Sequence, residues 1–326
     1  MKRRTATLAM AATMVTIALP SIAQPARPYR VAWVSSERKN VPSANLEAFR
    51  GGLRELGYVE GRDLVIETWL GEGSGERVSK MVPAILAWKP DLIVASSGLA
   101  FFPLKGAGVK LPIVFSISAD PVEAKVVESY ARPGGDFTGI SLFTLALVGK
   151  RMELLKEMMP GVKRIAVIAN SQHPGEHLER DAARAAAAAQ GLVLRYFSVS
   201  SEAELEVALA DIARARDDAI LAFADGFTMG FAGRIAEFSR KYRIPAIDGW
   251  AQFAEAGNLM TYGPVGPDVY RRLASYADRI RKGAKPGDLP VELPIKVEFV
   301  INEKTAKALG ITIAPGVLAR ADQVIR

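Results

Sequence analysis

The strict alternation of short apolar runs with amphipathic segments constrains this chain more than any other feature. From Arg30 onward, strand-length runs rich in Val and Ile are each followed by a helix-length segment. The first such segment places four large apolar residues on one helical face: Leu46, Phe49, Leu53 and Leu56. Strands that alternate with helices form parallel sheets, because a helix must carry the chain back between successive strands. The sequence therefore predicts an α/β fold.

The alternation occurs twice along the chain. The first series ends near residue 130, and a second series with a similar number of runs begins with a predicted helix over residues 145–159. The stretch "SYARPGGDFTGIS", residues 129–141, separates them and contains Pro133, Gly134, Gly135 and Gly139, which end helices and permit unusual backbone angles. We predict two doubly wound Rossmann-like domains, with "FTGIS" as the extended crossing between them and residues 257–266 as a return crossing.

The first residues have the pattern of a secretory signal peptide. A basic start, Met1 to Arg4, precedes an apolar run from Ala6 to Leu19 and a small-residue cleavage signal ending at Ala23. The run is shorter than the roughly 20 residues that span a bilayer. We predict that residues 1–23 are removed and that the mature protein is periplasmic. The Arg3-Arg4 pair leaves the twin-arginine route open, although general secretion is favoured.

Composition excludes several classes of function. The chain has no cysteine, so it has neither disulfides nor a thiolate nucleophile. Loss of Lys2, Arg3 and Arg4 with the signal would leave 39 basic against 35 acidic residues, a net charge of +4. The basic residues are scattered among acidic ones, so no nucleic-acid partner is predicted.

The sequence lacks the familiar motifs of enzyme active sites. It contains no G-x-S-x-G elbow, no Walker loop and no G-x-G-x-x-G after a strand. The segment "HPGEH", His173 to His177, matches the H-x-x-E-H pattern of a zinc peptidase family, but Pro174-Gly175 would interrupt the helix that such a site needs. We predict no metal, no cofactor and no catalytic residue.

Hydroxyl groups gather at the predicted strand ends of the first domain. Ligands of open α/β sheets bind at the carboxyl ends of the strands, beside helix N-termini. Ser and Asp at these ends also cap helices, and Asp120 before Pro121 is a good capping pair. Together the hydroxyls would suit a ligand carboxylate. The candidate ligand-binding residues here are Ser35, Ser36, Ser97, Ser118 and Asp120, with Ser141 on the crossing.

The equivalent strand ends of the second domain are more acidic. Asn170, Asp225 and Asp248 lie there, and either aspartate could pair with a ligand ammonium group or cap a helix. Aromatic residues nearby could hold an apolar part of the ligand, and we select Tyr262 with Phe101 or Phe102.

Four long segments resemble one protein family: "EAFRGGLRELGYVEGRDLVIE", "DPVEAKVVESYARPGGDFTGIS", "YGPVGPDVYRRLASYADRIRKGAKPGDLPVE" and "KVEFVINEKTAKALGITIAPGVLARADQVI". They are similar to the ABC transporter substrate-binding proteins of the tryptophan/tyrosine-binding type, and the resemblance covers nearly all of the mature chain. The chain departs from the family pattern at Asp136, where Asn is usual, and in residues 96–112, where an Ala-rich helix is usual. The resemblance therefore does not identify the ligand.

The resemblance implies the type I periplasmic binding fold, in which two lobes joined by a multi-strand hinge close on a ligand. It implies an N-terminal lobe of residues 24–140 plus about 262–298, and a C-terminal lobe of residues 141–261 plus about 299–326. The expected function is capture of a small organic solute, an amino acid or an aromatic carboxylate, and its delivery to the transmembrane permease subunits of an ABC importer. We expect the protein to work as a monomer.

Other functions on the same fold remain open. A sensor that presents its bound state to a membrane receptor is the main alternative, and an exported enzyme with a cleft site is a weaker one. A DNA-binding regulator is disfavoured by the export signal and by the lack of room for an N-terminal helix-turn-helix.

Overall fold

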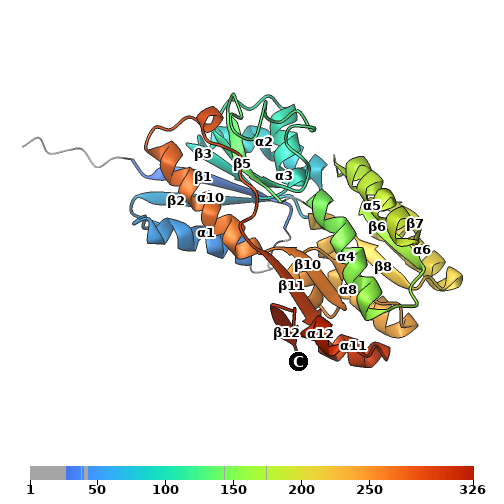
Figure 1. Ribbon diagram of the computed structural model, residues 1–326. Coiled ribbons are helices and arrows are strands. Elements are labelled where there is room, and N and C mark those ends of the chain that lie inside the picture. Colours follow the sequence, from blue (N-terminus) through green and yellow to red (C-terminus); the bar gives the residue numbers. More distant parts are fainter. Residues whose placement is uncertain (1–26, 38, 40–42, 143, 174) are drawn as a thin grey trace, which may run out of the picture.

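The computed structural model describes residues 27–37, 39, 43–142, 144–173 and 175–326, and it consists of two α/β lobes (Figure 1). The predicted signal peptide, residues 1–23, lies outside the described residues. Among the helices of the described part, none is both long and apolar enough to cross a membrane.

The N-terminal lobe is built on a five-stranded sheet in which every neighbouring pair is parallel, in the order β2-β1-β3-β4-β5. Its strands are β1 (Tyr29–Ser35), β2 (Leu64–Leu70), β3 (Leu92–Ala95), β4 (Ile113–Ile117) and β5 (Phe137–Ser141). Its helices are α1 (Ala44–Glu55), α2 (Gly75–Ala87), α3 (Gly98–Gly106), α10 (Gly266–Arg281) and the 3-10 turn η1 (Pro286–Asp288).

The C-terminal lobe repeats this order and extends it. Its seven-stranded sheet runs β12-β11-β10-β9-β8-β6-β7, and only the β10–β11 pair is antiparallel. The strands are β6 (Arg164–Asn170), β7 (Val193–Val199), β8 (Ala219–Ala222), β9 (Ala246–Asp248), β10 (Met260–Pro264), β11 (Val297–Asn302) and β12 (Gln323–Ile325). The helices are α4 (Thr144–Met158), α5 (Glu176–Gln190), α6 (Glu202–Ala215), α7 (Gly226–Gly230), α8 (Ala232–Tyr242), α9 (Ala251–Glu255), α11 (Glu303–Leu309) and α12 (Pro315–Leu318).

Alternating side chains of each central strand serve two different cores. Tyr29, Val31 and Trp33 of β1 pack under α1 and α10, whereas Ala32 and Val34 pack under α2 and α3. This period of two follows from the pleat of a strand whose two faces are both covered by helices. Figure 1 shows α1 and α10 side by side on one face of this sheet.

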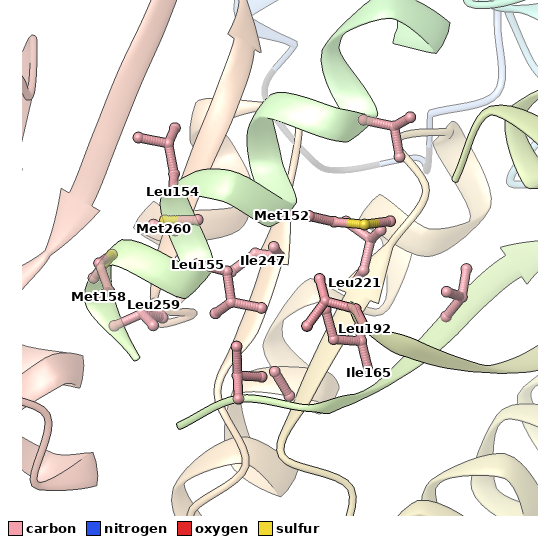
Figure 2. Close-up of a cluster of buried hydrophobic side chains, with 14 of the residues drawn as sticks. Met152, Leu154, Leu155, Met158, Ile165, Leu192, Leu221, Ile247, Leu259 and Met260 are labelled. Carbon is pink, nitrogen blue, oxygen red and sulfur yellow. The ribbon is translucent and has the colours of Figure 1, made fainter. Parts of the chain in front are cut away.

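The second lobe is layered in the same way. Met152 and Leu155 of α4 lie over Leu221 of β8 and Ile247 of β9, as Figure 2 shows. The opposite face of the sheet is covered by residues of α6 and α8. The predicted helix stop at Gly191 is confirmed, because Gly191 caps α5 in the left-handed conformation at φ 68°.

Two local predictions are corrected by the structure. Leu46, Phe49 and Leu53 are buried as expected, but Leu56 is 43% exposed because α1 ends at Glu55. The segment "FTGIS" is not a crossing: it forms β5 and pairs with β4 along its whole length. Its edge position lets it complete the first sheet before the chain passes to α4.

The chain passes between the lobes three times. It leaves the first sheet between β5 and α4, returns between β10 and α10, and enters the second lobe again before β11. The isolated bridge between Ile140 of β5 and Glu292 holds the third crossing against the edge strand of the N-terminal lobe. The two lobes, in which five strands follow the same order, are thus joined by three chain segments.

Candidate ligand-binding site

A cavity lies between the lobes at the carboxyl ends of both sheets. In each sheet the chain order reverses beside the first strand, between β1 and β3 and between β6 and β8, and loops leaving such strands diverge to form a crevice. The space between the lining atoms, counted with the part that is open to solvent, is about 270 Å³. It is lined by Ser96, Ser97, Gly98, Leu99, Ser116, Ser118, Leu142, His173, Asp225, Gly226 and Trp250.

The N-terminal wall is formed by hydroxyl groups. Ser97 caps α3, because its Oγ accepts a hydrogen bond from the Ala100 amide at 3.2 Å. The Ser97 hydroxyl also donates to Ser36 Oγ at 3.1 Å. Ser116 lies in β4 and Ser118 directly follows it, two residues further on. Side chains two positions apart along a strand point to the same side, and both line the cavity. This wall offers hydroxyls and the positive end of a helix dipole.

Asp225 forms the acidic part of the C-terminal wall. Its Oδ1 accepts hydrogen bonds from the amides of Phe227 and Thr228, both at 2.9 Å, and so caps α7. Its Oδ2 accepts from Asn170 Nδ2 at 2.6 Å. Asp225 is 5% exposed, and Oδ2 retains a lone pair for another donor. Capping therefore fixes the orientation of a carboxylate that still lines the cavity.

His173 joins the two walls. Its Nε2 lies 2.6 Å from Ser118 Oγ, and its ring is buried. Burial lowers the pKa of His173 below its ordinary value, more strongly than Asp225 and Glu176 raise it. No group of three or more His, Asp or Glu able to hold a metal ion occurs among the residues that the structure describes.

The lobes also meet through apolar and backbone contacts. Trp250 lines the cavity and packs against the core under α1 and α10 of the other lobe. Gly226 approaches Ser36 so closely that a Cβ there would lie 2.2 Å from Ser36 Oγ. The indole of Trp250, with Leu99 and Leu142, supplies the apolar lining.

A buried charged cluster lies beneath the C-terminal wall. Arg151 of α4 donates from Nε to the Tyr262 carbonyl at 2.9 Å, and its Nη1 is 3.7 Å from Glu179 Oε1. Asp248 Oδ1 accepts the amides of Gly249 and Trp250 and thereby holds the loop that carries the indole. Burial raises the pKa of Glu179 to about 8 and that of Asp248 to about 7, against the opposing effect of Arg151.

We expect this cluster to make stability fall as pH rises from about 4.5 to 8. Glu179 and Asp248 hold protons more tightly folded than unfolded, so deprotonation in this window favours the unfolded chain. His173 acts in the opposite direction below pH 6.5. The melting temperature of the wild-type protein should therefore be lower at pH 8.0 than at pH 5.5. In Glu179→Gln this fall should be about 3 °C smaller. Equal falls in the two proteins would contradict this assignment.

The structure brings together only some of the candidate residues. Ser97, Ser118 and Asp225 line the cavity, while Ser36 and Asn170 contact lining residues. Asp248 is fully buried below Trp250 and does not line the cavity. Ser36, Ser97, Asn170 and Asp225 come from the ends of β1, β3, β6 and β8, the strands that flank the points where chain order reverses, which explains why they meet.

The remaining candidates point elsewhere. Phe101 is fully buried among Phe102, Phe115 and Phe137 in the core of the N-terminal lobe. The Tyr262 ring packs against Phe299 in the C-terminal core, and the Asp120 carboxylate accepts from two amides of its own turn and from Tyr130. Ser35 Oγ accepts from the Glu37 amide, and Ser141, the last residue of β5, does not line the cavity.

Sequence reasoning missed Ser116, Leu142 and His173 as site residues. Ser116 could have been found, because it precedes Ser118 by two positions and must face the same side of the strand. His173 follows the end of β6 by three residues, so its position after a strand end is the signal that could have found it.

A larger hollow, about 1,230 Å³ when the part open to solvent is counted, lies at the opposite end of the C-terminal lobe, among Val162, Asp218 and Ile244. These residues precede β6, β8 and β9, so the hollow lies at the amino ends of the strands. Ligands of open α/β sheets bind at the carboxyl ends, so we assign the ligand site to the smaller interlobe cavity.

The duplicated topology, the three crossings and the interlobe cavity define the type I periplasmic binding fold. A conserved domain protein from Vibrio cholerae O1 biovar eltor has the same fold with TM-score 0.84 and 27% identity, over 91% of this chain and all of the other. An ABC domain from Streptococcus pneumonia, solved in complex with L-Trp, gives TM-score 0.83 and 27% identity at the same coverage. The predicted fold class is confirmed.

Residues 42–325 match the sequence model of the ABC transporter substrate binding protein family, and the chain belongs to this family. A relative described as a tyrosine-binding protein, from Clostridioides difficile strain R20291, is 24% identical over 263 residues. That alignment covers 81% of this chain and 75% of the relative. The family resemblance seen in the sequence is thereby confirmed.

Proposed function

We propose that this protein is the extracytoplasmic solute-binding component of an ABC importer and that its ligand is an aromatic amino acid. The observation that carries the proposal is the pairing of hydroxyls on one wall of the cavity with Asp225 on the other. Such walls complement the carboxylate and the ammonium group of a zwitterion. The relatives that bind L-Trp and tyrosine support the same ligand class.

Each part of the cavity has a role in this proposal. Ser118 and the N-terminus of α3 beside Ser97 hold the carboxylate, Asp225 holds the ammonium group, and Trp250 contacts the aromatic ring. The ligand can bind one wall through its carboxylate and the other through its ammonium group only when the lobes are together. It therefore favours the closed form over the open one. The permease subunits recognise that closed form, and no covalent chemistry takes place.

The ligand class is tested on the protein as purified. Mass spectrometry of small molecules released by denaturation, together with calorimetric titration with L-tryptophan and L-tyrosine, should identify an aromatic amino acid. A sugar, a nucleoside or a metal ion as the released ligand would overturn the proposal.

Replacing Asp225 with asparagine should weaken L-tryptophan binding by about 10- to 100-fold, since a hydrogen bond to a charged group is lost. Binding of indole-3-propionate, which lacks the ammonium group, should change by much less. Asp120→Asn is the matched control, because the Asp120 carboxylate also accepts from two backbone amides but lies away from the cavity. Equal losses for both ligands would show that Asp225 does not contact the ammonium group.

A further inference from the structure

The imidazole of His173 reaches across the cavity from one lobe to a hydroxyl of the other. It comes from the loop between β6 and α5, lines the cavity, and places Nε2 2.6 Å from Ser118 Oγ at the end of β4. Its main-chain amide donates to the Asn170 carbonyl at 3.0 Å, which ties the base of the side chain to the end of β6.

The other ring nitrogen settles which atom carries the proton. Nδ1 accepts a hydrogen bond from the Gly175 amide at 3.2 Å, so Nδ1 has no proton. A neutral imidazole has one N–H group, which must therefore be on Nε2 and must donate to Ser118 Oγ. The lowered pKa of His173 agrees with a neutral ring, because burial disfavours the imidazolium form.

This arrangement leaves the Ser118 proton free. The Ser118 oxygen accepts from His173, and among the described residues its hydroxyl has no second hydrogen-bond partner. The Ser97 hydroxyl differs, since it already donates to Ser36 Oγ. Of these two hydroxyls on the N-terminal wall, Ser118 is the one whose proton is available to a ligand.

We infer that His173 is a positioning residue of the ligand site: by donating to Ser118 it turns the Ser118 hydroxyl into a donor for an anionic ligand group. The inference rests on the proposed function for the identity of that group, a carboxylate. Because His173 and Ser118 belong to different lobes, the donor acquires this orientation only when the lobes are together.

A first experiment tests the proton position without any ligand. Long-range ¹H–¹⁵N correlation spectra of ¹⁵N-histidine-labelled protein at pH 7.5 should show His173 as the neutral tautomer with the proton on Nε2. His177 is exposed and supplies the internal reference. A protonated ring, or a proton on Nδ1, would overturn the inference whatever the ligand proves to be.

A second experiment measures how His173 affects ligand binding through Ser118. It compares the binding of L-tryptophan, which has a carboxylate, with that of L-tryptophanamide, which has none. His173→Leu should lower the preference for the acid over the amide by about tenfold, as expected for one charge-assisted hydrogen bond. His173→Gln, whose amide N–H can donate, should restore part of the preference, and His177→Gln should leave it unchanged. In a Ser118→Ala background, His173→Leu should change it by less than about twofold.

The outcomes separate the inference from the proposed function. Equal weakening of both ligands by His173→Leu, or an undiminished effect in the Ser118→Ala background, would overturn the positioning role while L-tryptophan binding stands. Failure of wild-type protein to bind L-tryptophan or L-tyrosine would overturn the proposed ligand class, and the tautomer measurement would still decide the inference.

Discussion

Replacing Gly139 with alanine should destabilise the protein by about 4 kcal/mol or more, because this backbone position cannot accept a side chain. Gly139 has φ 154°, and a Cβ there would lie 2.0 Å from the Phe115 carbonyl oxygen and 2.6 Å from the Phe115 nitrogen. Both atoms belong to the β4 backbone, which pairs with Gly139 itself. Relief would require β5 to move away from β4.

Urea unfolding of Gly139→Ala at neutral pH measures this effect. The matched control is Gly233→Ala in α8, where a Cβ would meet no atom within 4 Å and the substitution should be neutral or slightly stabilising. The clash also bears on the site, because β4 carries Ser116 and leads to Ser118. A Gly139→Ala protein as stable as the Gly233→Ala protein would show that the strands do not pair as described.

Replacing Arg151 with methionine should cost about 3–5 kcal/mol at pH 8, because it leaves two buried carboxyls without their opposing charge. Arg151 is fully buried, and it is the charged group that most favours the ionised forms of Glu179 and Asp248. The unbranched methionine side chain fills most of the volume that Arg151 occupies. The loss of stability therefore reflects the missing charge more than a cavity.

The pH dependence distinguishes this explanation from simple loss of packing. At pH 5.5 both carboxyls can be neutral, so the cost of Arg151→Met should be clearly smaller than at pH 8. The double variant Arg151→Met with Glu179→Gln should recover part of the stability at pH 8. Chemical denaturation of the three proteins at the two pH values measures both effects, and a cost independent of pH would rule out the electrostatic explanation.

The sequence predicted the architecture well because the relevant signals are local. The alternation of residues in β1 and the apolar face of α1 each depend on neighbours within a few positions. The caps at Ser97 and Gly191 are likewise set by the residue type at one helix end. The prediction of "FTGIS" as a crossing is wrong because an edge strand and an extended crossing have the same local pattern, and only pairing with β4 distinguishes them.

The site was predicted in part, and particular pairs of residues show why. Ser118 lines the cavity whereas Asp120, two residues later, turns its carboxylate to its own loop and to Tyr130. Phe101 fits an aromatic pocket by its position after β3, yet it packs into the core, and the cavity instead receives Trp250 from the other lobe. Side-chain direction at a strand end depends on torsions that residue types do not specify.

The sequence by itself determined the two α/β series, the capping residues and the membership of a family whose motifs extend over most of the chain. Only the tertiary structure decided which strand ends share a cavity and which side chains line it. The contact between His173 and Ser118 joins residues 55 positions apart in different lobes. Its geometry depends on how the two sheets face each other, and that arrangement results from packing over the whole molecule rather than from any local pattern.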